Sequence, residues 1–247
     1  MTDQTTNPAV TDRSAETRTR ILDAALREFA LHGLAGARTE RIATAAGVNK
    51  ALLYYHFDSK EKLYLAAFEM IAGRVRDSSM AVFFREDSTP GERVLRTALN
   101  HFDRVIGQQE FQSLMQQEMI RLHKGESGVM PVLVKRVFEP LFVMYRAMVR
   151  EGIEAGELIN ADWQQIWLAS LGANVFYFLS APVWKLSTGE DPLAIEALAL
   201  RRKNILEFLG QAIFKDRQHG AALAAKIFAD TPMPAIEGDR VNFGRNV

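Results

Sequence analysis

The sequence predicts an all-α protein in which a small N-terminal domain of three helices precedes a larger helical domain. From about Ser14 to about residue 215, apolar residues recur at spacings of three and four, the period of an amphipathic helix. No segment alternates apolar and polar residues between hairpin turns, as strands would. No internal repeat is present. Packed helices are therefore expected to form the whole core.

The first helix is expected to begin near Ser14, after a flexible arm at residues 1–13. It is expected to end at His32-Gly33, where glycine readily adopts the left-handed conformation that closes a helix. Two short helices and then a long one, at about 59–84, follow. The apolar face of the first helix consists of residues at the spacing i, i+3, i+7 and i+8, namely Leu22, Ala25, Phe29 and Ala30.

Turn residues divide the rest of the chain into long segments with helical periodicity. Because a proline inside a helix removes a hydrogen bond, Pro140 is expected to kink or split the helix around it. A short helix at 221–228 and a loose tail are expected near the C-terminus. The predicted domains are 14–60, 61–216 and a C-terminal extension at 217–247. The long helices are expected at about 91–107, 110–123, 129–155, 162–185 and 192–215.

The composition is that of a soluble globular protein and excludes several classes. The 30 basic and 30 acidic residues cancel, which argues against coating of nucleic acid by bulk charge but allows a local basic patch. The absence of cysteine excludes disulfides, thiolate zinc sites and cysteine nucleophiles. The N-terminus lacks the parts of a secretory signal, and no apolar run approaches the ~18 residues of a membrane span. The protein is therefore expected in the cytoplasm, without a membrane partner.

The sequence contains no convincing metal, cofactor or catalytic motif. His101 and His123 have no carboxylate at a spacing suited to a shared metal ion, so no metal site and no cofactor are expected. No acid/base constellation or glycine-rich phosphate loop supports catalysis. An enzyme is therefore not expected.

The segment RTERIATAAGVNKALLYYHFDSK predicts a helix-turn-helix. Thr39 is expected to cap a first short helix with its hydroxyl. Gly47 then allows a sharp reversal, and Asn49 is expected to cap a second short helix. Ser59 or Asp58 is expected to cap the long helix that follows, whose free N–H groups would suit a phosphate.

The second short helix has an outer surface suited to nucleic acid. Leu53 and Phe57, four residues apart, form its buried edge, which leaves donors, aromatic rings and small groups on the other faces. Lys50 can reach guanine acceptors in the major groove, while Ala51 and Leu52 can touch thymine methyl groups. Tyrosine hydroxyls and lysine can also bond phosphate oxygens, which set the register on the duplex.

Other roles are open for several of these side chains. Either tyrosine of the Tyr54–Tyr55 pair could pack against the following helix. His56 could pack or cap as readily as contact DNA, and Leu52 could belong to the core. These alternatives are decided only by the packing around each residue.

The residues from about 14 to 64 together resemble the DNA-binding domain of the tetracycline-repressor (TetR) family. The resemblance implies that Thr39 and Lys60 hold phosphates. The sequence departs from the family at Lys50-Ala51-Leu52, where a Gly-Thr pair often follows the lysine, so no operator sequence is implied. The matching features are Ile21-Leu22, Phe29, Gly33, Thr39, Ile42-Ala43, Ala46-Gly47-Val48, Leu53-Tyr54, His56-Phe57, Ser59-Lys60 and Leu63. The predicted DNA-binding residues are Arg38, Thr39, Thr44, Asn49, Lys50, Ala51, Leu52, Tyr54, Tyr55, His56 and Lys60.

The larger domain is expected to form a homodimer. One recognition helix is too small a contact for specific binding, and two half-sites about 34–36 Å apart require two subunits. The resemblance implies that the last two long helices, 162–185 and 192–215, form a four-helix interface. The residues expected there, each as well suited to the core of one subunit, are Leu168, Leu171, Gly172, Val175, Ile205, Leu206, Leu209 and Ile213.

The resemblance also implies a ligand pocket in the larger domain. Its middle helices are rich in methionine and aromatic residues, which line pockets for irregular apolar ligands but also form ordinary cores. The residues expected to contact a ligand are Phe102, Phe111, Met115, Glu118, Met119, Phe142, Trp167, Asn174 and Phe178, with Asn174 and Glu118 as polar anchors.

The resemblance implies a ligand-responsive regulator of transcription, usually a repressor. Its partners would be double-stranded operator DNA, a second copy of the chain, and a small apolar or amphipathic ligand that releases the DNA. A regulator controlled by a protein partner is the first alternative. An all-α enzyme is the second.

Overall fold

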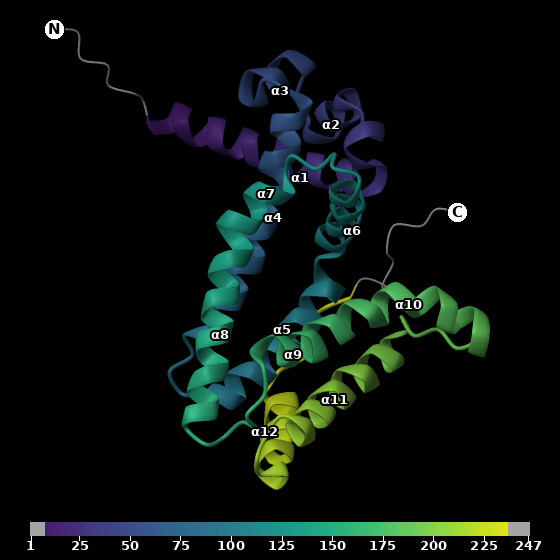
Figure 1. Cartoon of the computed structure of the whole chain (residues 1–247). Coiled ribbons are helices and arrows are strands. Elements are labelled where there is room, and N and C mark those ends of the chain that lie inside the picture. The colour runs from purple at the N-terminus through teal and green to yellow at the C-terminus, as the bar shows by residue number, and fades with distance from the viewer. Residues whose placement is uncertain (1–7, 237–247) are drawn as a thin grey trace, which may run out of the picture. The chain divides into compact units, whose positions relative to one another are not determined.

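The computed structural model describes residues 8–236, and every regular element in them is a helix. The only β-bridge in this range, between Leu158 and Phe214, is isolated. The all-α prediction is therefore confirmed for the described residues. Figure 1 labels the elements: α1 (Pro8–Gly36), α2 (Thr39–Ala46), α3 (Lys50–Phe57), α4 (Lys60–Phe83), α5 (Pro90–Gly107), α6 (Gln109–His123), α7 (Met130–Leu133), the π-helix η1 (Val134–Phe138), α8 (Glu139–Glu154), α9 (Trp163–Trp167), the π-helix η2 (Leu168–Gly172), α10 (Ala173–Thr188), α11 (Ile195–Ala212) and α12 (Arg217–Asp230).

The first helix is longer than predicted at its N-terminal end. α1 begins at Pro8 instead of near Ser14, so the expectation of a flexible arm is wrong for residues 8–13. Proline suits the first turn of a helix because its missing N–H has no partner there. The predicted break lies at Gly33, whose φ of 67° and ψ of 176° are not helical, although the helix resumes as far as Gly36. Residues 1–7 of the expected arm lie outside the described residues.

The predicted helix at 129–155 is divided into α7, η1 and α8. Pro140 lies in the first turn of α8 and has no N–H to donate to the carbonyl four residues earlier. The turns just before it are correspondingly wider and form the π-helix η1. The predicted helix at 162–185 also contains a π-helix, η2, and continues to Thr188.

The C-terminal extension contains a longer helix than predicted. α12 begins at Arg217 instead of residue 221 because Asp216 accepts hydrogen bonds from the backbone N–H groups of Gln218 at 2.9 Å and His219 at 3.1 Å. α12 packs extensively on α11. The last residues of the expected tail, 237–247, lie outside the described residues.

The described chain forms two compact units. Unit 1 contains residues 8–73 and 110–133, and unit 2 contains residues 74–109 and 134–236. This division differs from the predicted domains, because most of α6 and the first half of α4 belong with the N-terminal helices.

Hydrogen bonds from α6 explain its place in unit 1. The break at Gly33 leaves carbonyl groups of the preceding turn without helical partners. Ser113 Oγ and Gln117 Nε2 donate to one of these, the Ala30 carbonyl, at 2.7 and 2.9 Å. The Phe29 and Tyr64 rings meet edge to face at 4.9 Å in the same unit.

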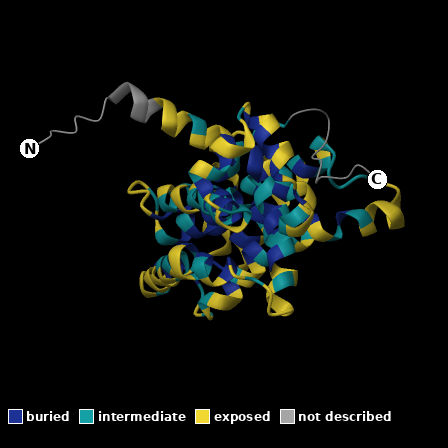
Figure 2. Cartoon of the chain, turned by 90° about the horizontal axis from the view of Figure 1, so that it is seen from above, coloured by how far each residue is buried: buried dark blue, intermediate teal, exposed yellow. Residues whose placement is uncertain are grey.

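In unit 2 the largest apolar cluster brings together side chains from α5, α8, α11 and α12. Figure 2 shows buried bands beside exposed bands on the same helices, as amphipathic helices require. α11 and α12 approach most closely at Gly210 and Gly220, where a Cβ built on Gly220 would lie 1.9 Å from the Gly210 carbonyl oxygen. The buried Arg202 bonds both oxygens of Asp103 at 2.8 and 2.9 Å and also donates to the carbonyls of Thr231 and Pro232. These contacts hold the C-terminal helix in the unit.

Candidate nucleic-acid interface

α2 and α3 are joined by a turn whose geometry was predicted from glycine. Gly47 has the left-handed φ of 66°, and its N–H closes α2 by donating to the Thr44 carbonyl at 3.1 Å. Ile42, Ala43 and Ala46 are buried on one side of α2. The two short helices and the glycine turn therefore form a helix-turn-helix.

The start of α3 and its buried edge are as predicted. The Asn49 side chain caps the helix by accepting from the Leu52 N–H at 2.8 Å. Leu53 and Phe57 are buried. The opposite surface is therefore free to meet another molecule.

The exposed surface of α3 carries Lys50, Ala51, Leu52 and Tyr55. Tyr55 is 79% exposed, which is unusual for a large aromatic ring and fits a contact with a partner. Its ring meets that of His56 edge to face, with the centroids 5.5 Å apart.

The other two aromatic side chains of α3 have partners in the chain. Tyr54 is half-buried, and its hydroxyl lies 3.4 Å from Thr39 Oγ1 on α2. His56 is half-buried, with its ring between those of Tyr55 and Phe57. Tyr54 thus contacts α2, and not the following helix that the alternative named, while His56 packs between its neighbours as its alternative role proposed; both keep part of their surface exposed.

The cap of α2 was predicted wrongly. Thr39 is the first residue of the helix and is buried, while Arg38 occupies the cap position without a side-chain hydrogen bond. As the first residue of α2, Thr39 faces α3, where its hydroxyl contacts that of Tyr54. A cap residue precedes the helix, so Thr39 cannot also be the cap. Arg38 remains exposed at the end of the helix, and Thr44 is exposed with its hydroxyl donating to the Glu40 carbonyl at 2.9 Å.

Of the two residues predicted to cap α4, Ser59 and Asp58, Ser59 does so. Ser59 Oγ accepts from the Lys62 N–H at 3.1 Å. Lys60, predicted to hold a phosphate, donates to the Ala35 carbonyl at 3.2 Å. Its ammonium group is therefore held at the C-terminal end of α1.

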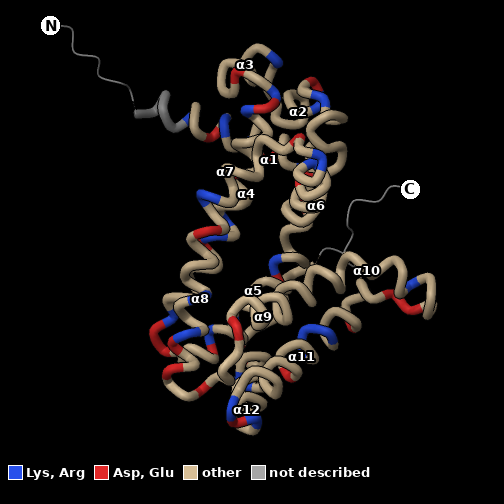
Figure 3. The backbone as a smooth tube through the Cα atoms, viewed as in Figure 1, with Lys and Arg blue, Asp and Glu red and all other residues tan. Residues whose placement is uncertain are grey.

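Lys50 has a partner that the sequence did not indicate. Its ammonium group forms an ion pair with Glu40 on α2 and lies 5.9 Å from the centre of the Tyr54 ring. The hydrogen bond and the charge of each partner lower the pKa of Glu40 and raise the pKa of Lys50. Both side chains are exposed, so water and salt screen this pair. Figure 3 shows both signs of charge around α2 and α3.

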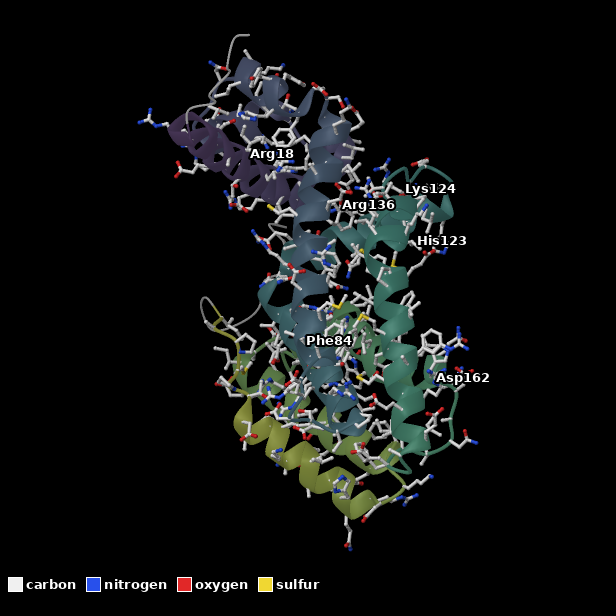
Figure 4. The ribbon with its side chains drawn as sticks, turned by 90° about the vertical axis from the view of Figure 1, so that its left-hand side faces the viewer. Arg18, Phe84, His123, Lys124, Arg136 and Asp162 are labelled. Atoms are coloured by element: carbon white, nitrogen blue, oxygen red, sulfur yellow. The ribbon has the colours of Figure 1, made fainter. Side chains whose placement is uncertain are left out.

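Arg18 on α1 is a second residue that sequence reasoning missed. Its guanidinium carbon lies 5.1 Å above the centre of the Phe57 ring, at the C-terminal end of α3. Figure 4 labels Arg18. This stacking contributes to holding α3 on α1. The helical periodicity of α1 identified its buried apolar face but gave no signal for a contact made by an exposed arginine.

The predicted ligand residues fall in both units. Unit 1 contains Phe111, Met115, Glu118 and Met119, and unit 2 contains Phe102, Phe142, Trp167, Asn174 and Phe178. In unit 2, the rings of Phe102 and Phe178 lie 5.1 Å apart and those of Phe142 and Trp167 lie 5.4 Å apart.

Glu118 already has a full set of partners in unit 1. Its carboxylate is completely buried and accepts from the Tyr64 hydroxyl and from Arg121 NH1, each at 2.8 Å, and from the Ser127 hydroxyl. Burial and the hydrogen bond to Glu118 raise the pKa of Tyr64 well above its usual value. This network links α4, α6 and the loop before α7.

Four of the predicted dimer contacts are wrong. The α11 residues Ile205, Leu206, Leu209 and Ile213 are buried in the core of a single chain. Leu171 is also buried, while Gly172 and Val175 are half-buried. Leu168 is 52% exposed and remains available to a partner.

A different set of apolar side chains is exposed on the same helices, which run side by side in Figure 1. Leu168, Phe176, Leu179, Val183 and Leu186 follow each other at helical spacing, and Leu200 and Phe208 are exposed on α11. We call these seven residues the apolar stripe. The predicted α11 residues thus lie on its buried face, whereas Leu200 and Phe208 lie on its exposed face.

The stripe also accounts for an unexpected property of this region. Trp163–Thr188 forms 26 consecutive helical residues with a window of mean hydropathy 1.4, of which 28% is buried. By length and composition alone it could cross a membrane, so the expectation that no apolar segment approaches this length is wrong. One such helix is weak evidence for a span, because a core helix of a soluble protein can have the same length and composition.

The helix-turn-helix, with its capped second helix and exposed lysine and tyrosine, places this chain in the class of helix-turn-helix DNA-binding proteins. Residues 21–67 match the sequence model of the bacterial regulatory proteins of the tetR family. The match covers the helix-turn-helix domain, which is therefore similar to the DNA-binding domain of that family.

The comparisons extend the likeness beyond this domain. The HTH-type transcriptional repressor NicS of Pseudomonas putida is 33% identical over 124 residues, which are 49% of this chain and 57% of the repressor. The chain thus spans little more than half of that relative.

Two solved structures share the fold. A putative transcriptional regulator from Saccharomonospora viridis, in complex with choline, has a TM-score of 0.65 and 18% identity, covering 81% of this chain and 99% of that one. The regulator FadR of Bacillus subtilis, in complex with stearoyl-CoA, has a TM-score of 0.58 and 20% identity, covering 77% of this chain and 96% of that one. At these identities the likeness shows the fold alone.

Proposed function

We propose that this chain is a homodimeric repressor of transcription that binds palindromic operator DNA in the bacterial cytoplasm and releases it when a small apolar or amphipathic ligand binds. The observation that carries the proposal is the surface of α3. It combines an exposed lysine and an exposed tyrosine with small and apolar groups, on a helix fixed by its cap and its buried edge.

The recognition surface has distinct roles for its residues. Lys50, Ala51 and Leu52 lie in the first turn of α3, the part of a recognition helix that reaches base edges. Tyr55 contacts the phosphate backbone through its hydroxyl, and Arg38 and Thr44 add donors from α2 and its cap position. Lys50 exchanges Glu40 for a guanine when DNA binds.

The apolar stripe supports dimerisation. Contiguous exposed apolar side chains are rare on monomeric proteins, and here they lie on two neighbouring helices of unit 2. We assign the stripe as the contact with a second copy, which supplies the second recognition helix that a palindrome requires.

A small ligand is the proposed effector. The two solved structures of this fold are complexes with choline, a small cation, and with stearoyl-CoA, which combines a long apolar chain with charged groups. The ligand shifts the dimer away from its DNA-binding state by its greater affinity for the released state. The residues proposed to contact it are the aromatic pairs of unit 2, Phe102–Phe178 and Phe142–Trp167, together with Asn174.

Selection of bound sequences from random duplex DNA tests the proposal. The full chain should enrich a palindrome with half-sites one helical turn, or a multiple of it, apart. Sedimentation of the complex should show at least two chains per duplex. Enrichment of no sequence would overturn the assignment to specific DNA binding, and enrichment of a non-palindromic site by a monomer would overturn the dimer.

A further inference from the structure

Arg104, on α5, is a half-buried arginine bonded only to uncharged groups. Its NH1 donates to the Val75 carbonyl at 3.2 Å, to Ser78 Oγ at 3.3 Å and to Ser79 Oγ at 2.7 Å. In the described part of the chain, neither NH2 nor Nε has a hydrogen-bond partner, and no carboxylate lies within 4.0 Å of the guanidinium. Burial lowers the pKa of Arg104 to about 10, so the group remains charged at neutral pH.

The neighbouring acid is already paired with another arginine. Asp103 places both carboxylate oxygens on the buried Arg202, at 2.8 and 2.9 Å. Successive residues of a helix point about 100° apart, so Asp103 and Arg104 face different neighbours. A half-buried positive charge of this kind is available to an anion, because no ion pair in the described residues neutralises it.

His101 lies one turn before Arg104 on the same side of α5. Its Nδ1 is 3.5 Å from the Asn174 side-chain nitrogen, which also donates to the Ala98 carbonyl at 2.9 Å. Because an amide N–H donates in this contact, Nδ1 accepts and the ring proton lies on Nε2. Burial, with the charge of Arg104, lowers the pKa of His101 to about 3, so the ring stays neutral and Nε2 is a donor. Nε2 has no partner in the described chain.

Asn174 on α10 is the third polar residue of this group. Its side chain is completely buried, and its amide oxygen accepts no hydrogen bond from the described residues. Buried acceptors without a donor are rare in folded proteins. A carboxylate has no proton to offer this oxygen, so the Arg104 charge without a counter-charge, and not Asn174, is the observation that indicates an anionic ligand.

We propose that Arg104 and His101 form an anion site in unit 2 that binds the carboxylate of an acid with an apolar body. The Arg104 guanidinium supplies the charge and the His101 Nε2–H supplies a second donor, with Asn174 as the positioning residue that fixes the histidine tautomer. The surrounding interior is apolar. It includes Phe102, the residue after His101 on α5, and Phe178 on α10, whose rings form a pair. This inference rests on the proposed function, since it names the chemical class of the effector.

Binding of matched probes to the full chain tests this assignment. Butanoate, decanoate and hexadecanoate are compared by calorimetry with their methyl esters, which keep the apolar body and lose the charge. At least one acid should bind about tenfold or more tightly than its ester. The variant Arg104→Gln should reduce that acid to the affinity of its ester, Arg104→Lys should keep part of the preference, and Arg146→Gln, at an exposed arginine of the same unit, should leave it unchanged.

Several results would overturn the inference. Equal binding of acid and ester by the natural protein would do so, as would an undiminished preference in Arg104→Gln or no binding by any acid of the series. The ester comparison needs no variant, so it decides the question even if Arg104→Gln fails to fold. Operator binding is measured in parallel by gel shift: normal DNA binding without acid preference rejects only this site, whereas absent DNA binding rejects the proposed function.

Discussion

Tyr54 and Tyr55 are adjacent in the sequence but have different surroundings in the structure. Tyr54 meets Thr39 on α2, whereas Tyr55 is exposed beside Lys50, one turn earlier. The sequence predicted that this helix had an outward surface, because Leu53 and Phe57 define the buried edge by spacing alone. It could not predict the Lys50–Glu40 pair, since residues ten positions apart meet only through the geometry of the turn.

The DNA contacts can be tested by removing single side chains. Lys50→Ala or Tyr55→Ala should weaken operator binding by about 1–3 kcal/mol, because each removes a base or phosphate contact. Titrations by gel shift at fixed salt measure the change. Lys124→Ala, at an exposed lysine of the α6–α7 loop, is the control and should bind as the natural protein does. Equal affinity of all four proteins would contradict the assigned surface.

His101 should make folding stability fall in mild acid. Its pKa is lowered to about 3 in the folded protein, against about 6.5 when unfolded. Below pH 6.5 the unfolded chain therefore binds a proton that the folded chain does not, and the free energy of unfolding decreases as pH falls from 6.5 towards 3. Between pH 7 and 5 this contributes a loss of about 1–2 kcal/mol.

Urea unfolding of the natural protein and of His101→Gln over this pH range isolates that contribution. Other titrating groups affect both proteins alike, so the two curves should converge as pH falls. Parallel curves would show that His101 takes up a proton as easily folded as unfolded.

At the scale of elements, the approximate bounds of most helices followed from periodicity, glycine and proline, but the division of the predicted helices at 129–155 and 162–185 did not. The errors have local causes. The start of α1 at Pro8 and of α12 at Arg217 depends on residues that suit a first turn, whereas apolar periodicity becomes visible only further along. Both faces of α11 carry large apolar residues, so periodicity could not tell which face meets the core and which is exposed.

The crossing of α11 and α12 requires glycine on both helices. Gly220→Ala should destabilise the protein by about 1–3 kcal/mol, because the added Cβ would meet the Gly210 carbonyl oxygen and force the helices apart. Gly73→Ala is the matched control: nothing lies within 4 Å of its added Cβ, so helix propensity should leave stability unchanged or raise it by up to about 1 kcal/mol. Urea unfolding followed by circular dichroism measures both. A neutral Gly220→Ala would mean that the two backbones can separate freely.

At the scale of the whole molecule, the sequence separated an N-terminal from a larger helical part but placed their boundary incorrectly. Unit 1 includes most of α6 because the side chains of Ser113 and Gln117 donate hydrogen bonds to the carbonyl of Ala30. That residue lies 83 and 87 positions earlier in the chain. Such pairings depend on tertiary structure and leave no periodic signal. The same limit applies to Glu118, which the composition of α6 suggested as a ligand anchor and which instead binds three residues of its own unit.

Dimerisation should depend on the apolar stripe. Phe176→Glu or Phe208→Glu would place a charge in the proposed interface and should weaken the dimer by about tenfold or more, with a parallel loss of operator binding. Sedimentation at several protein concentrations measures the dimer. Leu31→Glu, at a residue of unit 1 that is similarly exposed, should remain dimeric. If both phenylalanine variants stayed fully dimeric, another surface would have to be the interface.

The ion pair between Lys50 and Glu40 has a consequence for efforts to retarget this regulator to a new promoter. Replacing Lys50 alone would leave the exposed Glu40 carboxylate without its partner, and its charge would repel the phosphates of a duplex bound at α3. This repulsion would weaken binding to every candidate promoter alike and hide any gain in discrimination between them. A library that varies positions 40 and 50 together would avoid this penalty, and the best pairs should come from joint changes.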